Sequence, residues 1–458
     1  MSVLLTPEPK GLLMTGVKQT LEKLGIVPDK QLGQNFLTDS NFAAWIVRQL
    51  GEGALGTVIE IGPGLGALTD NLVGRAKRLV LVEFDKKLAA HLKERFQDDS
   101  SVEVIHADAA QVDLRPFFAE GPVSAIGNLP YSAAGAILQN FLNPPSPVQR
   151  GVFMLQAEMA DRICASPRTK AYGVLTLRLQ AHYVVRRLRT IPTEPFHPRP
   201  TVDSTVIELD ARDRRQQAVF DHRLFDRMIR HGFSQRRKQL KKLLPESPQA
   251  WEEVVAGLGV APTCRAEELS LEQWIELTNL FDTHPLKDHA QKADELFDVV
   301  DERNEVIEQR PRHEVHAEGL RHRAIHIFVY NGKGKLFLQK RTHLKDACPG
   351  LWDSSAAGHL DAGEDYAAAA TRELEEELGI AVEPLLLGEI PAQKDTGWEF
   401  VQLFAARHDG PFTWPASEIE TGAFFPLDVI RSWIANRPGD FAPGFLRCWV
   451  LCEDLRTR

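Results

Sequence analysis

The feature that most constrains the fold is an apolar strand pattern that runs directly into a glycine-rich loop. Residues 57–61 read Thr-Val-Ile-Glu-Ile, and residues 62–69 read Gly-Pro-Gly-Leu-Gly-Ala-Leu-Thr. A strand, a glycine turn and a helix form the first unit of a doubly wound α/β fold, where missing side chains let a ligand approach the backbone. The loop alone does not specify the ligand, and a bare strand-to-helix turn would give the same pattern.

Polar residues close the three apolar runs that follow, and they narrow the choice of ligand. Glu83 ends the next run, about 20 residues after the glycines, where a carboxylate meets ribose hydroxyls in such folds. Asp108 follows a third run, 102–105, and Asn128 follows a fourth, 123–126. Because the carboxyl ends of parallel strands share one edge of a sheet, we expect one site for an adenosine-containing ligand. The glycine loop by itself fits the dinucleotide of a dehydrogenase as well as S-adenosylmethionine, and Asp108 tips the balance because it is placed as an acceptor for an adenine amine would be.

Asn128 also opens the tetrapeptide Asn-Leu-Pro-Tyr, residues 128–131. An Asn amide, a proline-bounded carbonyl and an aromatic ring at adjacent positions can hold a planar exocyclic amine from three directions. Methylating an adenine requires this, because hydrogen bonds that draw the N–H groups out of conjugation raise the nucleophilicity of the nitrogen. Tyr131 can stack on a base that has left its own stack. The alternative is a plain strand end followed by a proline turn.

A chain of 458 residues is too long for one ordinary core, so two or three domains are expected. Its longest apolar stretches are only of strand length, which predicts no transmembrane helix. Residues 1–20 lack the basic start, apolar middle and cleavage site of a signal peptide, which favours a cytoplasmic location. The five cysteines are scattered without a CxxC pair, so reduced structural thiols are expected.

Positive charge is concentrated in one part of a chain whose net charge is −9. Residues 150–245 hold roughly 20 Lys and Arg against roughly 9 Asp and Glu. A region of helical periodicity, 220–281, is expected to carry on successive helical turns a basic group made of Arg236, Arg237, Lys238, Lys241 and Lys242. We expect this group to lie against nucleic-acid phosphates, and the alternative is an ordinary solvated helix surface.

Together these motifs resemble the ribosomal RNA adenine dimethyltransferase family. The resemblance spans residues 12–283 and includes further matching segments at residues 34–37 (Gln-Asn-Phe-Leu), 153–156 (Phe-Met-Leu-Gln), 170–173 (Lys-Ala-Tyr-Gly), 196–204 (Phe-His-Pro-Arg-Pro-Thr-Val-Asp-Ser) and 233–238 (Phe-Ser-Gln-Arg-Arg-Lys). It implies dimethylation of two adjacent adenosines near the 3′ end of small-subunit ribosomal RNA, with S-adenosylmethionine as the methyl donor.

The resemblance also implies roles for individual residues. The cofactor would be held by Asn35, Leu37, Gly62, Gly64, Glu83, Asp108 and Asn128. Asn128, Pro130 and Tyr131 would present the adenine, and Phe196 would be a second stacking face. No general base is needed, because the product ammonium is acidic enough to lose its proton to water, and catalysis is mostly positioning for in-line transfer. The family usually continues the tetrapeptide with Asn, whereas this chain has Ser132, which is expected to alter packing rather than activity.

A second constellation begins after a polar stretch, residues 284–293, which we interpret as a linker. Residues 358–380 fit the spacing G-x5-E-x7-R-E-U-x-E-E-x-G-U, where U is aliphatic, at every fixed position. The Ala, Glu and Leu content predicts a helix over 366–378. Three carboxylates on one face of that helix, Glu373, Glu376 and Glu377, would repel each other until a hard cation such as Mg²⁺ binds.

This spacing is that of the Nudix box, and residues 294–458 resemble the Nudix hydrolase superfamily. The resemblance implies an α/β/α sandwich that cleaves a nucleoside diphosphate linked to another group, with Mg²⁺ or Mn²⁺ bridging the diphosphate oxygens and activating water. The metal ligands would be Glu373, Glu376 and Glu377, with Glu364 as a further ligand or base. Arg372 would orient the carboxylates by a salt bridge.

Residues 320–325 and 349–353 resemble the isopentenyl diphosphate isomerase branch of that superfamily. In that branch a reactive Cys precedes a Gly-His pair, but this chain has Ala357, so the thiol needed for proton shuttling is absent. Isomerase is therefore the minor interpretation. His322 and His359 are candidate metal ligands, although a histidine without a metal is the commoner case.

The sequence thus predicts a bifunctional α/β enzyme, with a Rossmann-like methyltransferase sheet over residues 1–210, a small all-helical RNA-binding subdomain over 211–283 and a Nudix domain over 294–458. Expected partners are the small ribosomal subunit with its RNA and a nucleoside diphosphate-type small molecule, without a membrane, and a monomer is expected. The alternative is that one half has lost catalysis and acts as an RNA-binding or docking module. The sequence does not name the Nudix substrate.

Overall fold

The computed structural model describes residues 14–28, 33–286 and 294–457. Internal contacts divide the chain into unit 1 (Met1–Arg212, Ile229–Leu244 and Val260–Trp274) and unit 2 (Asp213–Met228, Pro245–Gly259 and Ile275–Arg458). The domain boundaries drawn from the sequence stay predictions, and most of the expected linker lies outside the described residues. No helix in the described part of the chain is both long and apolar enough to span a bilayer.

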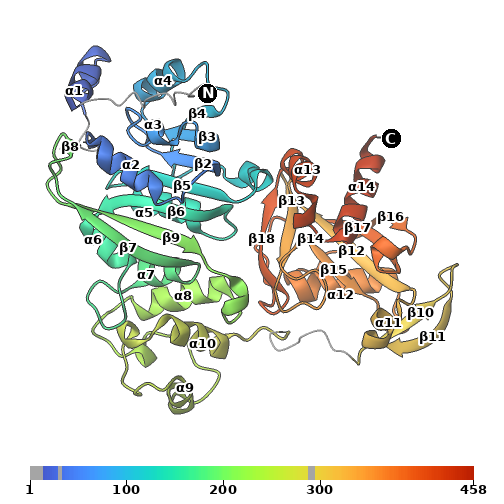
Figure 1. Cartoon of the computed structure of the whole chain (residues 1–458). Coiled ribbons are helices and arrows are strands. Elements are labelled where there is room, and N and C mark those ends of the chain that lie inside the picture. Colours follow the sequence, from blue (N-terminus) through green and yellow to red (C-terminus); the bar gives the residue numbers. More distant parts are fainter. Residues whose placement is uncertain (1–13, 29–32, 287–293, 458) are drawn as a thin grey trace, which may run out of the picture. The chain divides into compact units, whose positions relative to one another are not determined.

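A seven-stranded sheet with the order β4-β3-β2-β5-β6-β9-β7 forms the centre of unit 1 (Figure 1). The strands are β2 (Leu55–Ile61), β3 (Ala76–Glu83), β4 (Val102–His106), β5 (Val123–Asn128), β6 (Val148–Gln156), β7 (Tyr183–Ile191) and β9 (Ser204–Ala211). β2 to β6 pair in parallel, whereas β9 pairs antiparallel with both β6 and β7. The four predicted strands are confirmed as β2 to β5, and the Rossmann-like arrangement is confirmed.

Helices connect these strands, and a short separate ladder lies beside them. The helices are α1 (Met14–Lys23), α2 (Ser40–Arg48), α3 (Thr69–Leu72), α4 (Lys86–Arg95), α5 (Ala134–Leu142), α6 (Ala157–Ile163) and α7 (Val174–Gln180), with a 3₁₀ helix at Arg115–Glu120. Asp39 caps α2, because its side chain accepts from two backbone N–H groups of the first turn. The ladder pairs β1 (Phe36–Leu37) with β8 (Phe196–His197).

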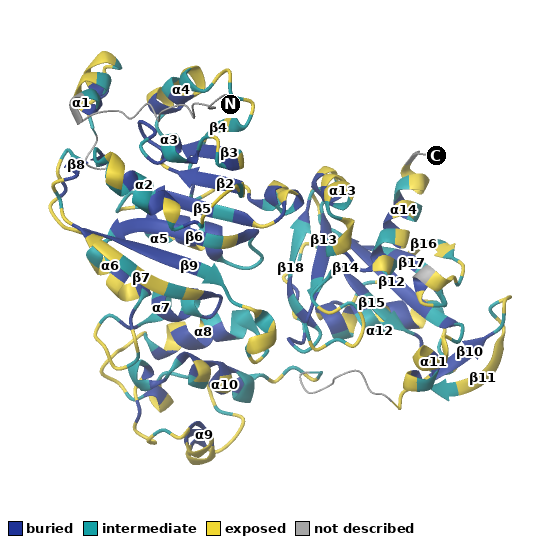
Figure 2. Cartoon of the chain, in the orientation of Figure 1, coloured by how far each residue is buried: buried dark blue, intermediate teal, exposed yellow. Residues whose placement is uncertain are grey.

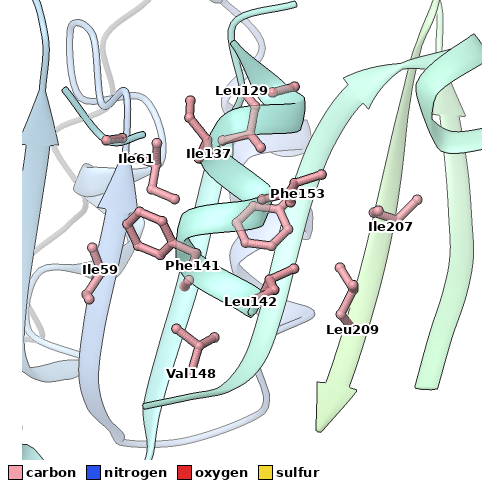
Figure 3. Close-up of a cluster of buried hydrophobic side chains, with 14 of the residues drawn as sticks. Ile59, Ile61, Leu129, Ile137, Phe141, Leu142, Val148, Phe153, Ile207 and Leu209 are labelled. Atoms are coloured by element: carbon pink, nitrogen blue, oxygen red, sulfur yellow. The ribbon is translucent and has the colours of Figure 1, made fainter. Parts of the chain in front are cut away.

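The sheet of unit 1 is buried on both faces, as alternation along its strands requires. Ile59 of β2 belongs to a cluster with Phe141 of α5 and Phe153 of β6 (Figure 3). Its neighbour Val58 points to the opposite face and packs with Ile46 of α2. Figure 2 shows the resulting belt of buried strands through the middle of the unit.

Phe141→Ala tests how much this core contributes to stability. Phe141 is 0% exposed, so the substitution is expected to lower the free energy of unfolding by about 3–5 kcal/mol. Urea titration of the full chain measures this, with Gln139→Ala, an exposed position on the same helix, as the matched control. A loss no larger than that of the control would mean that α5 does not pack on the sheet as described.

The segment after β9 is mainly helical, with α8 (His222–Gly232), α9 (Trp251–Leu258), α10 (Leu271–Phe281) and 3₁₀ helices at Arg214–Gln216, Leu240–Lys242 and Ala266–Glu268. One prediction about this region is wrong in detail. The basic group does not lie on successive helical turns, because residues 234–239 form turns and bends after α8 has ended. Gly232 is the last residue of α8 and Ser234 lies two residues beyond it, and both residue types favour turns over helix.

Unit 2 contains a second seven-stranded sheet, with the path β14-β13-β12-β17-β16, to which β15 adds beside β12 and β18 beside β13. The strands are β12 (His322–Tyr330), β13 (Leu336–Arg341), β14 (Trp352–Asp353), β15 (Ala356–His359), β16 (Leu385–Ile390), β17 (Glu399–Arg407) and β18 (Ile419–Phe425). β12 and β17 are parallel, and the remaining pairs are antiparallel. A hairpin, β10 (Leu296–Val300) with β11 (Val306–Pro311), lies outside this sheet.

Helices cover both faces of the second sheet, which makes it a sandwich. Ile327 of β12 packs in a cluster with Leu374 of α12 (Tyr366–Leu378). The next residue, Phe328, contacts Phe445 of α14 (Pro443–Thr457) with ring centroids 5.7 Å apart. Two further helices are α11 (Arg312–Glu318) and α13 (Leu427–Asn436). The predicted α/β/α architecture is therefore present, and the bounds of α12 are those predicted.

Candidate active sites

A pocket of about 250 Å³ opens at the carboxyl ends of β2 to β5 in unit 1. It is lined by all seven residues expected to hold a cofactor, namely Asn35, Leu37, Gly62, Gly64, Glu83, Asp108 and Asn128. Pro130 and Ser132 also line it. The strand ends meet here because the strands are parallel neighbours in one sheet, so groups far apart in sequence share one edge.

Glu83 is built into the floor of this pocket. It is 6% exposed, and its carboxylate accepts from Gly64 N at 3.0 Å and from Asp85 N at 2.8 Å. Burial raises the pKa of Glu83, while these backbone hydrogen bonds oppose the rise. The hydrogen bond from Gly64 N to Glu83 ties the glycine loop to β3. The loop and the carboxylate expected to bind the ribose therefore move together.

The glycines of the loop are required by the backbone and by contacts. Gly62 and Gly64 have φ values of +64° and +60°, a region that favours glycine. A Cβ on Gly64 would lie 3.1 Å from the ring of Phe36. At these two positions, therefore, the loop has no side chain that would crowd Phe36 or the pocket.

Two pocket residues were missed by sequence reasoning. Glu60, one residue before the end of β2, is 1% exposed and accepts from Thr69 Oγ1 at 2.7 Å. Burial raises the pKa of Glu60 to about 8, so this carboxyl is largely protonated at neutral pH. Phe84 is 56% exposed and lines the pocket. The sequence feature that could have indicated it is an aromatic residue directly after the acidic residue that ends a strand.

The groups expected to present the adenine occupy different environments. Asn128 Nδ2 donates to Asn35 O at 2.9 Å, which leaves Oδ1 as its acceptor. Tyr131 is half-buried, and its hydroxyl lies 3.1 Å from Ser204 Oγ. Phe196 is not among the residues that line the pocket; it is 3% exposed and packs in the core cluster that contains Leu37. Its role as a stacking face requires movement out of that cluster and stays a prediction.

In unit 2, α12 carries the carboxylates of the Nudix box. Glu377 is 4% exposed, and its Oε2 accepts from Gln339 Nε2 at 3.1 Å and from Ala357 N at 3.2 Å. Burial, followed by the neighbouring Glu377 charge, raises the pKa of Glu373 to about 8. Two buried carboxyl groups side by side are costly unless a cation or protons neutralise them.

Arg372 compensates part of this charge, as the sequence predicted. Its guanidinium donates to Glu364 at 2.9 Å, to Glu373 at 2.8 Å and to Glu376 at 3.1 Å. Gly358, the first residue of the box, is required because a Cβ there would lie 2.0 Å from Glu373 Oε1. Glu364, Glu373 and Glu376 therefore gather around one arginine, whereas Glu377 contacts Gln339 and Ala357 instead. Among the described residues, these carboxylates do not come together as a group of three that could hold one ion, although oxygen donors suit a hard cation.

A separate histidine cluster lies beside the box. Among the described residues, His316, His322 and His359 offer ring nitrogens within 4.8 Å of one another. His322 Nδ1 lies 2.9 Å from Leu320 O, while its buried Nε2 has no hydrogen-bond partner. Glu399 Oε1 lies 3.1 Å from His359 Nε2 and 3.7 Å from His322 Nε2. Sequence reasoning did not identify His316, because a spacing of six residues from His322 is not typical of a metal site.

The electrostatics of this cluster favour neutral imidazoles at His316 and His359 beside the Glu399 carboxylate. Burial lowers the pKa of His316 and of His359 to about 4 in each case. Burial opposes ionisation of Glu399, but the imidazoles of His322 and His359 hold its pKa well below the usual range. Neutral imidazole nitrogens and one carboxylate are the forms in which these groups bind metals.

Comparison with known proteins identifies the first half of the chain. The family model described as "Ribosomal RNA adenine dimethylase" matches residues 28–283. The chain belongs to this dimethylase family. Ribosomal RNA small subunit methyltransferase A of Bacillus cytotoxicus is 36% identical over 282 residues, which cover 59% of this chain and 97% of that protein. The corresponding protein of Bacillus mycoides is 37% identical over 281 residues, covering 59% and 96%.

The dimethylase carries a second domain, because residues 320–445 match the model of the NUDIX domain. A solved structure, DR0079 from Deinococcus radiodurans, is 28% identical and covers 36% of this chain and 98% of its own, with a TM-score of 0.31. The dimethylase and NUDIX family matches indicate enzymatic activity. The chain thus combines a domain of the dimethylase family with a NUDIX domain.

The predicted RNA-binding residues of the dimethylase differ in their surroundings. Arg236 is exposed but tied to neighbouring segments, since its guanidinium donates to Glu267 at 2.8 Å and to Lys170 O at 2.7 Å. Arg237, Lys238 and Lys241 are exposed on the turn and the 3₁₀ helix that follow α8. The structure brings these exposed side chains into one short surface segment, but it gives Arg236 a structural role in addition.

Proposed function

We propose that the first half transfers methyl groups from S-adenosylmethionine to two adjacent adenosines near the 3′ end of small-subunit ribosomal RNA. The observation that carries this proposal is the pocket on which all seven expected cofactor residues converge. The Bacillus relatives are named as methyltransferases of the small-subunit ribosomal RNA, which supports this RNA as the proposed substrate. We also infer that the protein is located in the cytoplasm and acts as a monomer.

The pocket residues fit an adenosine-containing methyl donor. Glu83 would accept from ribose hydroxyls, and Asp108 would accept from the adenine amine. Asp108 also accepts from Ala110 N at 2.9 Å, which fixes its direction. The bound cofactor would supply an electrophilic methyl group, and what the chain must do is place a nucleophile in line with it.

Placing that nucleophile falls to Asn128 and its neighbours. Asn128 Oδ1 would accept one N–H group of the target amine, which helps to localise the lone pair on nitrogen. Pro130 O accepts from Ala133 N at 3.1 Å and from Ala134 N at 2.9 Å, so Pro130 would shape the turn beside the amine rather than offer a free carbonyl. Tyr131 would stack on the turned-out base. The ammonium formed by transfer loses its proton to water, so no base is assigned.

Charge reversal on the exposed segment tests the RNA contacts. Arg237→Glu with Lys238→Glu is expected to weaken binding to unmethylated small ribosomal subunits and to lower the slope of log affinity against log salt by about 1–2. Glu246→Lys with Glu253→Lys, at exposed positions elsewhere in the helical segment, is the control. An unchanged salt slope in the double reversal would exclude these side chains from the RNA interface.

The first half is tested directly by methyl transfer from labelled S-adenosylmethionine to unmethylated small subunits, followed by mapping of the product. Two dimethylated neighbouring adenosines are expected. Binding of a dinucleotide instead of S-adenosylmethionine would favour a dehydrogenase. Subunit binding without transfer would mean that this half is a docking module.

We propose that the second half is a Mg²⁺- or Mn²⁺-dependent hydrolase of a nucleoside diphosphate-type substrate. Glu373, Glu376 and Glu377 would hold the metal, and Glu364 would be a further ligand or the base. Bound metal would polarise the diphosphate and lower the pKa of water. A panel of nucleoside diphosphate derivatives, assayed for pyrophosphate-bond cleavage with and without Mg²⁺, tests this and names the substrate.

The histidine cluster supports a second candidate for this half, an isomerase-like enzyme with a nitrogen-rich metal site. Three imidazoles and Glu399 form a donor set that suits Zn²⁺ or Mn²⁺. Ala357, where that branch has its Cys, opposes isomerase activity. Isomerisation of isopentenyl diphosphate by the full chain would favour this candidate, and hydrolysis alone would exclude it.

A further inference from the structure

The strap, defined as residues 35–38, lies between the two parts of the methyl-transfer site. Asn35, Phe36 and Leu37 line the pocket on one side. On the other side, the strap pairs with the segment that carries Phe196. The strap thus contacts both the cofactor pocket and the segment whose Phe196 is expected to stack on the target base.

Contacts on the cofactor side are close and specific. Asn35 O accepts from Asn128 Nδ2 at 2.9 Å. The ring of Phe36 covers Gly64, with only 3.1 Å to the position a Cβ would take. A ligand entering the pocket therefore meets a wall whose position depends on both the glycine loop and Asn128.

Contacts on the adenine side centre on one carbonyl. Thr38 donates twice to Pro195 O, from its backbone N at 2.8 Å and from Oγ1 at 3.0 Å. Leu37 pairs with Phe196, and Phe36 pairs with His197. Leu37 and Phe196 also share one buried cluster. Thr38 uses both acceptor positions of the Pro195 carbonyl. Residues 195–197 are therefore expected to move together with the strap.

We propose that the strap couples the two binding events, so that cofactor in the pocket raises the affinity for the target RNA, with Thr38 as the positioning residue. The proposal rests on the proposed methyl-transfer function. To reach a base, Phe196 must leave its buried cluster. A ligand that fills the pocket shifts the strap, and the strap pairs with the strand that carries Phe196. Because coupling is reciprocal, RNA must raise the affinity for the cofactor by the same factor.

Thr38→Val tests this in the full chain, because valine keeps the shape of threonine and removes the hydroxyl bond to Pro195 O. Affinity for unmethylated small ribosomal subunits is measured with and without S-adenosylhomocysteine, which binds without reacting. We expect the wild type to bind subunits roughly 5-fold tighter or more with the ligand present. The ratio should fall below about 2-fold in Thr38→Val and be kept in Thr38→Ser.

A merely structural role of Thr38 would not change this ratio. In the absence of RNA, Thr38→Val should bind S-adenosylhomocysteine within about 2-fold of the wild type. A wild-type ratio of one, an unchanged ratio in Thr38→Val, or loss of S-adenosylhomocysteine binding by that variant alone would each overturn the coupling. If the wild type methylates subunits but shows no coupling, only the strap proposal fails, whereas absence of methylation by the wild type removes the proposed function and the strap proposal with it.

Discussion

Asn128→Ala is expected to lower methyl transfer to small ribosomal subunits by about 10²–10³-fold, while S-adenosylhomocysteine still binds. The reason is that Asn128 Oδ1 would accept one N–H of the target amine, an interaction needed most as the new bond forms. The variant also loses the bond from Nδ2 to Asn35 O, so a modest weakening of cofactor affinity is expected.

Single-turnover transfer at saturating cofactor separates these two effects. Gln139→Ala, exposed on α5 and outside the pocket lining, is the matched control and should transfer at the wild-type rate. Near wild-type transfer by Asn128→Ala would show that the amine is held by other groups. The hydrolase activity of the same preparation should be unchanged in either case, which reports that the variant chain is intact.

Glu377→Gln is expected to reduce diphosphate cleavage by roughly 10³-fold, because a metal ligand contributes several kcal/mol of transition-state stabilisation. The amide keeps the size of the side chain, so Gln339 and the Ala357 N–H retain a partner oxygen. What is lost is the negative charge that the cation requires.

Glu375→Gln is the control for this experiment, because Glu375 is exposed on the same helix and outside the proposed metal set. It removes the same charge and should leave cleavage within about 2-fold of the wild type. Raising the Mg²⁺ concentration should recover part of the activity of Glu377→Gln if affinity is what has changed. Equal activity of the two variants would mean that Glu377 is not a ligand.

Patterns confined to one strand or helix were predictable from the sequence. The four strands of the first sheet and the helix Tyr366–Leu378 are confirmed, because apolar period and helix propensity both act locally. The convergence of Glu83, Asp108 and Asn128 on one pocket was also foreseeable, since parallel strand order alone places their ends together.

Features set by tertiary contacts were not predictable. The turn that carries Arg237 and Lys238 reads as helix in its charge spacing, but the chain leaves the helix after Gly232. Phe196 sits in a core cluster rather than on the pocket wall, a placement that depends on its pairing with Leu37. His316 joins His322 and His359 only because β10, α11 and β12 pack on one another, and no local pattern reports such a meeting.

The account depends most on four strand ends and the strap surrounding one methyl donor. A crystal structure of the full chain with S-adenosylhomocysteine tests this most directly. We predict the ribose within hydrogen-bond distance of Glu83, the adenine amine facing Asp108, and the sulfur end of the ligand toward Asn128. A ligand bound elsewhere, or one from which these three side chains turn away, would contradict the proposed site and the strap together.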